Sequence, residues 1–213
     1  MSHYSTAYTR LHTMGDWLEM QFFNSSKIMQ ELTQFDDCWK PYNLRKPNNR
    51  WGLSITSLDG GLSGIPDLDS LSEYNKKNKT DIKNYHINKF TEVYEKMPTL
   101  QRIIDPWKPW LGRCHFLKLN EGGFFPEHYD INKLDYTYDD TRLIAFVNNS
   151  NKYVMKFLYE DKLMEVENGS LYWFNASKRH SVFSMEDNCI MIVFCLKFDE
   201  LLFEKIIQEY RMD

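Results

Sequence analysis

The sequence predicts a mainly β protein in which short strands form a jelly-roll barrel. Beyond Leu111 the chain consists of short apolar runs separated by turn residues, such as those at 148–151 and 167–169. Many short strands at close spacing are typical of a jelly-roll barrel. The length of 213 residues also suits one β-barrel domain. The expected strands are residues 113–119, 141–148, 153–159, 170–174, 180–183 and 189–198.

The first 110 residues predict a helical and irregular flank packed on the barrel. Apolar residues recur at helical spacing over residues 27–35, which Ser25 or Ser26 could cap, and over residues 90–104, where Pro98 interrupts the pattern. The other expectations are a strand or irregular arm over 1–24, a strand over 51–58, a lysine-rich solvated face over 72–88 and a helix cap at Thr99.

The C-terminal residues predict an amphipathic helix that covers the outside of the barrel. Leu202, Ile206 and Ile207 share one face of this helix, and Asp199 can cap its first turn. We therefore expect one domain over 1–213, made of the flank 1–110, the barrel core 111–198 and the helix 199–213.

Composition and charge argue against several classes of function. A net charge of −4 and a pI near 5.9 argue against general binding to nucleic acid or to anionic membranes. The longest apolar run, Cys189 to Leu196, is too short to cross a bilayer, and the first residues lack the apolar core of a secretory signal. The four cysteines show no CxxC spacing, so we expect reduced thiols and a cytoplasmic setting.

The stretch RCHFLKLNEGGFFPEHYD, Arg113 to Asp130, predicts a strand, a glycine turn and then two metal-binding residue types. His128 and Asp130 are two positions apart, so in extended chain they point to the same side. His180 stands near the start of a later apolar run. Two histidines and one carboxylate form the facial triad of non-haem Fe(II) oxygenases. We predict these three as metal ligands and catalytic centre; the alternative is a surface His-x-Asp pair, which is common by chance.

Residues 111–198 resemble the 2-oxoglutarate/Fe(II)-dependent dioxygenases. The resemblance rests on the order of a strand, Gly-Gly, HYD, TRLIAFVNN, a further strand and ENGSLYWFNASKRHSVFS. Within that superfamily the pattern looks most like the aspartyl/asparaginyl β-hydroxylase-like branch. The resemblance implies that His128, Asp130 and His180 hold Fe(II) in a double-stranded β-helix (jelly-roll/cupin-like) barrel. With the flanks predicted above, the expected fold is that barrel with N-terminal helices and a C-terminal helix.

The resemblance also implies a cation that holds the C5 carboxylate of 2-oxoglutarate. The family often carries an arginine about ten positions after the distal histidine, but this chain has the apolar run CIMIVF there. A buried dicarboxylate still needs a cationic partner. Arg142 is the first candidate, because related JmjC-type asparaginyl hydroxylases carry a lysine close to this position. The other candidates are Lys156, Arg113 and Lys118, and Arg142 could instead be a surface arginine paired with Asp139 or Asp140.

By resemblance, the expected activity is hydroxylation of an amino-acid side chain, free or in a polypeptide, with release of succinate and CO2. The rivals are a metal cupin with other chemistry, for which His115 is the only spare histidine nearby, and a non-catalytic jelly-roll binding module. Substrate should enter at the barrel mouth, where Asp59–Ser70 and Tyr129–Asp140 are the candidate lining loops. The second loop is acidic and aromatic, which suits a cationic or amino-group-bearing substrate.

Overall fold

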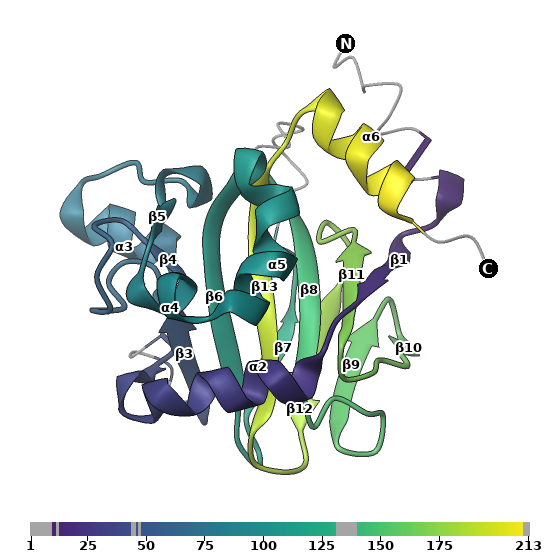
Figure 1. The fold of residues 1–213 in the computed structure, drawn as a ribbon, viewed down its shortest axis with the longest axis horizontal. Helices are drawn as coiled ribbons and strands as arrows, with labels where there is room; N and C mark the ends of the chain where they lie inside the picture. Colours follow the sequence, from purple (N-terminus) through teal and green to yellow (C-terminus); the bar gives the residue numbers. More distant parts are fainter. Residues whose placement is uncertain (1–9, 12, 44–45, 47, 131–139, 211–213) are drawn as a thin grey trace.

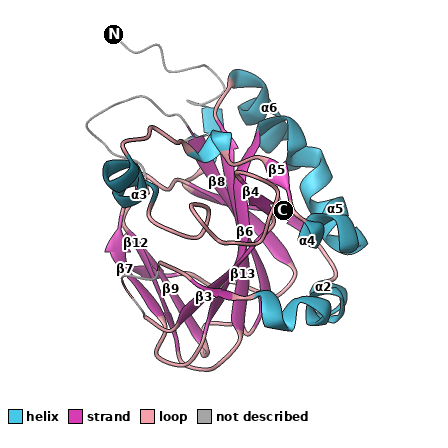
Figure 2. Ribbon diagram, turned by 90° about the vertical axis from the view of Figure 1, so that its left-hand side faces the viewer, coloured by secondary structure: helices cyan, strands magenta, loops and turns pink. Residues whose placement is uncertain are grey.

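Two antiparallel β-sheets packed face to face form the barrel that the sequence predicts (Figures 1 and 2). The computed structural model describes residues 10–11, 13–43, 46, 48–130 and 140–210. Helices form a minority of the chain, and most of them lie on one side of the barrel (Figure 2). The fold class is therefore the mainly β, double-stranded β-helix barrel predicted above.

The sheets combine strands from both halves of the chain. The main sheet has the order β1 (Trp17–Phe22), β11 (Ser170–Phe174), β8 (Asp140–Asn148), β13 (Cys189–Lys197), β6 (Leu111–Leu119), β3 (Arg50–Ser54) and β2 (Lys40–Pro41). The minor sheet has the order β10 (Lys162–Leu163), β9 (Met155–Tyr159), β12 (His180–Ser184) and β7 (Phe124–His128). A separate two-stranded sheet pairs β4 (Thr56–Ser57) with β5 (Lys89–Phe90). The strand predicted over 51–58 is therefore divided between two sheets.

Alternation along the strands separates two apolar cores. In β8, Leu143 and Ala145 belong to the core between the main sheet and the helices, whereas Ile144 and Phe146 belong to the core between the two sheets. Successive side chains of a strand point to opposite faces, so each long strand of the main sheet contributes to both cores. The inner core stops short of one end of the barrel, and the candidate site lies there.

The N-terminal arm completes the main sheet. β1 pairs antiparallel with β11, with Trp17 opposite Phe174, and β3 pairs with β6, with Ser54 opposite His115. These partners cover strand edges that would otherwise expose unpaired backbone groups. The sheet thus extends beyond the residues 111–198 that carry the sequence pattern.

Most of the helices cover the outer face of the main sheet and its β1 edge (Figure 1), whereas α3 (Leu71–Asn78) lies apart from them (Figures 1 and 2). They are α2 (Ser25–Leu32), α3 (Leu71–Asn78), α4 (Glu92–Lys96), α5 (Pro98–Ile104) and α6 (Glu200–Glu209), with 3-10 turns η1 (Thr33–Cys38), η2 (Asn84–His86) and η3 (Asp105–Trp110). No helix in the described part of the chain is long and apolar enough to span a membrane.

Two predicted helix caps were wrong. Helix α2 begins after Asn24, not after Ser25 or Ser26, because the Asn24 Oδ1 accepts the backbone N–H of the third helical residue at 2.9 Å. Thr99 does not cap α5. Its hydroxyl donates to the Glu31 carboxylate at 2.6 Å instead and links α5 to α2. The predicted cap of α6 is confirmed, since Asp199 Oδ1 accepts the Leu202 N–H at 2.8 Å.

Two neighbouring leucines of α6 offer a matched test of this packing. Leu202 is fully buried, whereas Leu201 is 70% exposed. We expect Leu202→Ala to lower the free energy of unfolding by about 2–5 kcal/mol, because it leaves a cavity against the sheet. Leu201→Ala should change it by less than about 0.5 kcal/mol. Urea unfolding followed by circular dichroism measures both, and equal losses would show that α6 does not dock as described.

Candidate active site

Two histidines and one aspartate meet where β7 and β12 lie side by side. His128 ends β7, His180 begins β12, and the two residues are opposite one another in the antiparallel ladder. Asp130 follows two residues after β7, where its N–H donates to the Ala176 carbonyl at 3.0 Å. One donor atom from each of the three side chains lies within 4.8 Å of the other two. The structure thus brings together the three residues that the sequence singles out.

The individual distances are close to those of a metal site. His128 Nε2 lies 3.3 Å from Asp130 Oδ1, and His180 Nε2 lies 3.9 Å from Asp130 Oδ2. Metal bonds of about 2.0–2.2 Å place adjacent ligand atoms roughly 3 Å apart. The three ligand atoms, which lie within 4.8 Å of one another, are thus somewhat more widely spaced than in a loaded site. Small side-chain movements would close it around one ion.

Both imidazoles are oriented by backbone carbonyls. His128 Nδ1 lies 2.7 Å from the Pro126 carbonyl oxygen, and His180 Nδ1 lies 2.9 Å from the Lys178 carbonyl oxygen. A carbonyl oxygen can only accept, so each Nδ1 carries a proton, and in the neutral ring each Nε2 has a lone pair directed at the cluster. Metal-binding histidines usually use their second nitrogen in this way. The donor set therefore fits a divalent first-row metal.

Electrostatics favour a charged carboxylate at the centre. Burial alone would raise the pKa of Asp130, but His128, Arg142 and His180 outweigh burial and hold that pKa well below its usual range. Burial lowers the pKa of His180. Burial also opposes the charged form of His128, but Asp130 and the Pro126 carbonyl together outweigh burial and raise the pKa of His128. An ionised carboxylate and a neutral imidazole are the ligand forms that a metal requires.

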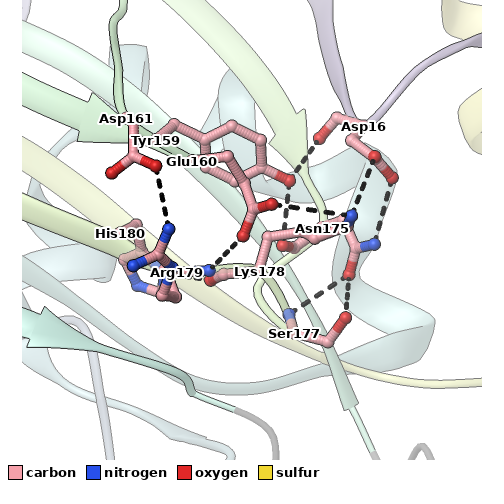
Figure 3. Close-up of polar contacts among 9 residues, drawn as sticks. All are labelled: Asp16, Tyr159, Glu160, Asp161, Asn175, Ser177, Lys178, Arg179 and His180. Atoms are coloured by element: carbon pink, nitrogen blue, oxygen red, sulfur yellow. Dashed lines mark hydrogen bonds and ion pairs between the residues drawn. The ribbon is translucent and has the colours of Figure 1, made fainter.

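A polar network holds the turn that carries His180 (Figure 3). Asn175 Nδ2 donates to Asp16 Oδ1 at 3.0 Å, and Asn175 Oδ1 accepts from the Ser177 hydroxyl and backbone N–H at 2.7 and 3.1 Å. Lys178 lies 3.9 Å from the Asp16 carboxylate and 3.8 Å from that of Glu160. The network fixes the Lys178 carbonyl that orients the His180 ring.

A chamber inside the barrel opens beside the triad. It encloses about 570 Å³ of non-protein space, open end included. Its polar lining is the triad with Tyr42, Arg113, His115 and Arg142, and its apolar lining is Leu117, Phe125, Ile144, Phe157, Phe174, Val182, Met191 and Val193.

Arg142 connects the chamber to the triad. Its side chain is only 4% exposed, and its Nε donates to Asp130 Oδ2 at 3.2 Å. Arg142 is therefore not the surface arginine of the alternative interpretation. Arg113 lines the same chamber from β6, where its Nη1 donates to the Asp69 carbonyl at 3.3 Å.

The two lysines proposed as cosubstrate anchors lie elsewhere. Lys156 stands between the inward-facing Met155 and Phe157 of β9, and its Nζ donates to the Lys152 carbonyl at 2.5 Å. Lys118 Nζ lies 4.3 Å from the ring centroid of Trp39, which belongs to the core under the helices. The structure brings neither lysine to the chamber.

A wider cavity lies outside the chamber and shares the triad residues His128 and Asp130 with it. Asp69 and Ser70, from the end of the predicted lining loop Asp59–Ser70, line this outer cavity. Of the second predicted loop, Tyr129–Asp140, residues 131–139 lie outside the described residues, so its role stays a prediction.

Sequence reasoning missed two parts of the site. Arg50 and Tyr42 line the cavities from the N-terminal flank, to which the sequence assigned no role. Asp16 supports the turn before His180 from a segment that shows no periodicity. The sequence signal that could have indicated this turn is the Asn175-x-Ser177 spacing, which is typical of an Asx turn.

No protein-family model and no curated protein matches the sequence. Solved structures with a similar fold include a prolyl-4-hydroxylase from Pseudomonas putida, at 14% identity and a TM-score of 0.48 over 86% of this chain and 93% of that one. A 2OG-Fe(II) oxygenase family oxidoreductase from Burkholderia pseudomallei has 10% identity and a TM-score of 0.49 over 90% and 88%. A viral collagen prolyl hydroxylase from Paramecium Bursaria Chlorella virus-1 has 9% identity and a TM-score of 0.46 over 86% and 97%.

The structural neighbours of this chain thus include 2OG-Fe(II) oxygenase family proteins at low sequence identity. Every one of these TM-scores is below 0.5, and the similarities do not distinguish branches of that family. The function is therefore inferred from the residues of the site and not from the similar structures.

Asp130→Asn tests the triad as a metal centre. We expect Co(II) or Mn(II) to bind the wild-type chain with one-to-one stoichiometry. The variant should bind the metal ion at least about 10- to 100-fold more weakly. Replacing even a residue that only hydrogen-bonds to a metal ligand typically lowers metal affinity by that factor. Calorimetry and the Co(II) absorption spectrum measure this. His86→Ala, an exposed histidine of η2, is the matched control. Unchanged affinity in Asp130→Asn would place the metal elsewhere.

Proposed function

We propose that the protein is an Fe(II)- and 2-oxoglutarate-dependent dioxygenase that hydroxylates an amino-acid side chain, free or in a polypeptide. The observation that carries the proposal is the convergence of His128, Asp130 and His180 beside a chamber lined by the buried Arg142 and the half-buried Arg113. In such a reaction one oxygen atom of O2 becomes the substrate hydroxyl, and the other enters the succinate that forms with CO2 from 2-oxoglutarate.

The triad suits this chemistry because it supplies only three protein ligands. A two-histidine, one-carboxylate set leaves coordination positions open for a cosubstrate and O2. When bound, the iron and 2-oxoglutarate supply the oxidising chemistry. The protein's contribution is to fix the ligands, through the Pro126 and Lys178 carbonyls at the histidines and through Arg142 at Asp130.

We assign the C5 carboxylate of 2-oxoglutarate to Arg142. A guanidinium has five N–H donors in a planar fork, so it can bond to Asp130 and to a second carboxylate together. Arg113 is the second cation of the chamber. Its Nε has no hydrogen-bond partner among the described residues, and a buried donor left unbonded is costly. Both features favour an anionic ligand in the chamber.

The remaining walls of the chamber would keep the reacting atoms away from bulk water. Phe157, Phe174, Val182 and Met191 form apolar surface against the triad, and the Phe174 ring lies 5.3 Å from the His180 ring. Excluding water strengthens electrostatic contacts inside the site and limits side reactions of the oxidant.

A metal cupin with other chemistry is the second candidate, and His115 is the observation that favours it. His115 lines the chamber, and its Nδ1 has no partner among the described residues. Burial, with Arg113 and Arg142, lowers its pKa and keeps it neutral. The described metal-binding group nevertheless consists of three residues and does not include His115.

The finer parts of the proposal rest on motif resemblance and composition. These are the aspartyl/asparaginyl β-hydroxylase-like branch, the cytoplasmic location, and a small amino acid or a peptide as substrate rather than nucleic acid or membrane. The order of HYD, TRLIAFVNN and NASKRH supports the branch. The net charge of −4 supports the choice of partner.

The activity has a direct test. We expect the protein with Fe(II) and ascorbate to convert 2-oxoglutarate to succinate, measured by mass spectrometry. Turnover should rise when the right amino acid or cell-derived peptide is added, and the product should gain 16 mass units of one oxygen atom. A protein that binds metal but consumes no 2-oxoglutarate under any condition would favour the cupin alternative. A protein that binds no metal would favour a binding module.

Arg142→Ala tests the cosubstrate anchor. Loss of a charge-assisted hydrogen bond of about 1.5–3 kcal/mol should raise the KM for 2-oxoglutarate about 10- to 100-fold. Lys156→Ala, which removes a cation from the other face of β9, should leave that KM unchanged. Because Arg142 also contacts Asp130, metal affinity is measured in parallel. Arg142→Lys should recover part of the loss. Equal effects of the two alanine variants would argue against the assignment.

A further inference from the structure

A second buried cation lies in the outer cavity, on the approach to the triad. Arg50, in β3, is only 6% exposed, and its guanidinium carbon lies 4.0 Å from the ring centroid of Phe125. That ring in turn stacks on His128 with centroids 6.1 Å apart. The Arg50 guanidinium is therefore one aromatic ring away from a predicted metal ligand.

The hydrogen bonds of this guanidinium are incomplete within the described residues. Its Nε has no partner there, and its Nη2 donates to the Lys46 carbonyl at a long 3.3 Å. Burial lowers the pKa of Arg50. An arginine nevertheless remains protonated in proteins, so the group is a buried positive charge. A buried charge needs an opposite charge or further hydrogen bonds, and a planar fork suits a carboxylate.

The formal charges around the outer cavity also favour an anionic ligand. Among the described residues that line the outer cavity, Lys46, Arg50, Arg113 and Arg142 are cations and Asp69 and Asp130 are anions, an excess of two (4 − 2). Fe(II) and the 2-oxoglutarate dianion would add +2 and −2 and leave that excess unchanged. Lys46 lies 3.5 Å from the Glu73 carboxylate, which offsets one charge. One positive charge remains in a loaded site, within a chain whose net charge is −4.

Arg50 is separated from the proposed cosubstrate position. It lines the outer cavity but not the inner chamber, where Arg142 and His115 lie. The two cavities share His128 and Asp130 as lining residues, so a molecule bound to Arg50 would approach the metal from the outer cavity. This is where the substrate of the proposed oxygenase would bind.

We propose that Arg50 forms a substrate subsite for a carboxylate, so that the substrate is a carboxylate-bearing amino acid or peptide. That the bound molecule is a substrate rests on the proposed oxygenase function. The binding of a carboxylate at Arg50 can be tested without turnover. The carboxylate can be the chain terminus of the substrate or an acidic side chain. Paired probes that differ only in charge distinguish these two sources.

The first measurement is binding to the full chain loaded with Co(II) and 2-oxoglutarate under nitrogen. The terminal pair is N-acetylalanine and N-acetylalaninamide, and the side-chain pair is N-acetylaspartic acid α-amide and N-acetylasparagine amide. We expect at least one carboxylate probe to bind about tenfold or more tightly than its neutral partner, as observed by ligand-detected NMR. Neutral partners that bind equally well in both pairs would overturn the proposal.

Arg50→Met is the variant that assigns the site, because it keeps an unbranched side chain against Phe125 and removes the charge. It should lose about tenfold or more of the affinity for the carboxylate probe, and Arg50→Lys should lose less. Lys108→Met, which removes a cation 4.7 Å from the Tyr94 ring outside both cavities, is the control. Retained preference for the carboxylate in a folded Arg50→Met chain would overturn the proposal.

Turnover measurements distinguish a failure of the carboxylate subsite from a failure of the proposed oxygenase function. If the oxygenase function holds, substrate-stimulated turnover should fall about tenfold or more in Arg50→Met and stay unchanged in the control Lys108→Met. If the wild-type chain consumes no 2-oxoglutarate, the proposed function fails, and the binding measurements still decide whether Arg50 holds a carboxylate. Substrates that work equally well as amides would overturn the subsite alone.

Discussion

The site depends on one buried charge pair, Arg142 with Asp130. Asp130 is placed beside two imidazoles at the end of β7, and Arg142 extends from β8 in the opposite sheet. Removing two charges from water is costly unless their geometry and remaining hydrogen bonds are good. Here the guanidinium bonds one carboxylate oxygen while the histidines lie near both oxygens. The pair therefore ties the two sheets together at the open end, where the apolar core no longer does.

The triad also divides the space around it into two regions of different chemistry. The inner chamber has mainly aromatic and aliphatic walls, whereas the outer cavity is wider and more polar, and Arg113 and Arg142 line both. Charged groups interact more strongly where water is excluded, so cations matter more in the chamber than at the mouth. A site arranged in this way can hold a dianionic cosubstrate deep in the barrel while a second molecule enters from outside.

The parts of the structure that follow from local patterns could be predicted from the sequence. Short apolar runs at close spacing predicted the barrel, and the two-residue spacing of His128 and Asp130 predicted that their side chains lie on one side. Alternation could also have excluded Lys156, because its neighbours on both sides are apolar residues that face inward. The position of Arg50 in the outer cavity could not be predicted, because its partners are Phe125 of β7 and the backbone of Lys46. Side chains that meet only through sheet pairing leave no signal in their own neighbourhood.

The support of His180 by the N-terminal arm has a consequence for how the protein is made. Asp16 holds the turn of Asn175 across 159 positions of the chain, and the distal histidine lies beyond that turn (Figure 3). Contacts between such distant segments form late, because the entropy of closing the intervening loop must be overcome first. A chain leaving the ribosome would expose Asp16 long before Asn175 exists. The metal-binding centre would therefore be among the last features to form, after the sheet that surrounds it has closed.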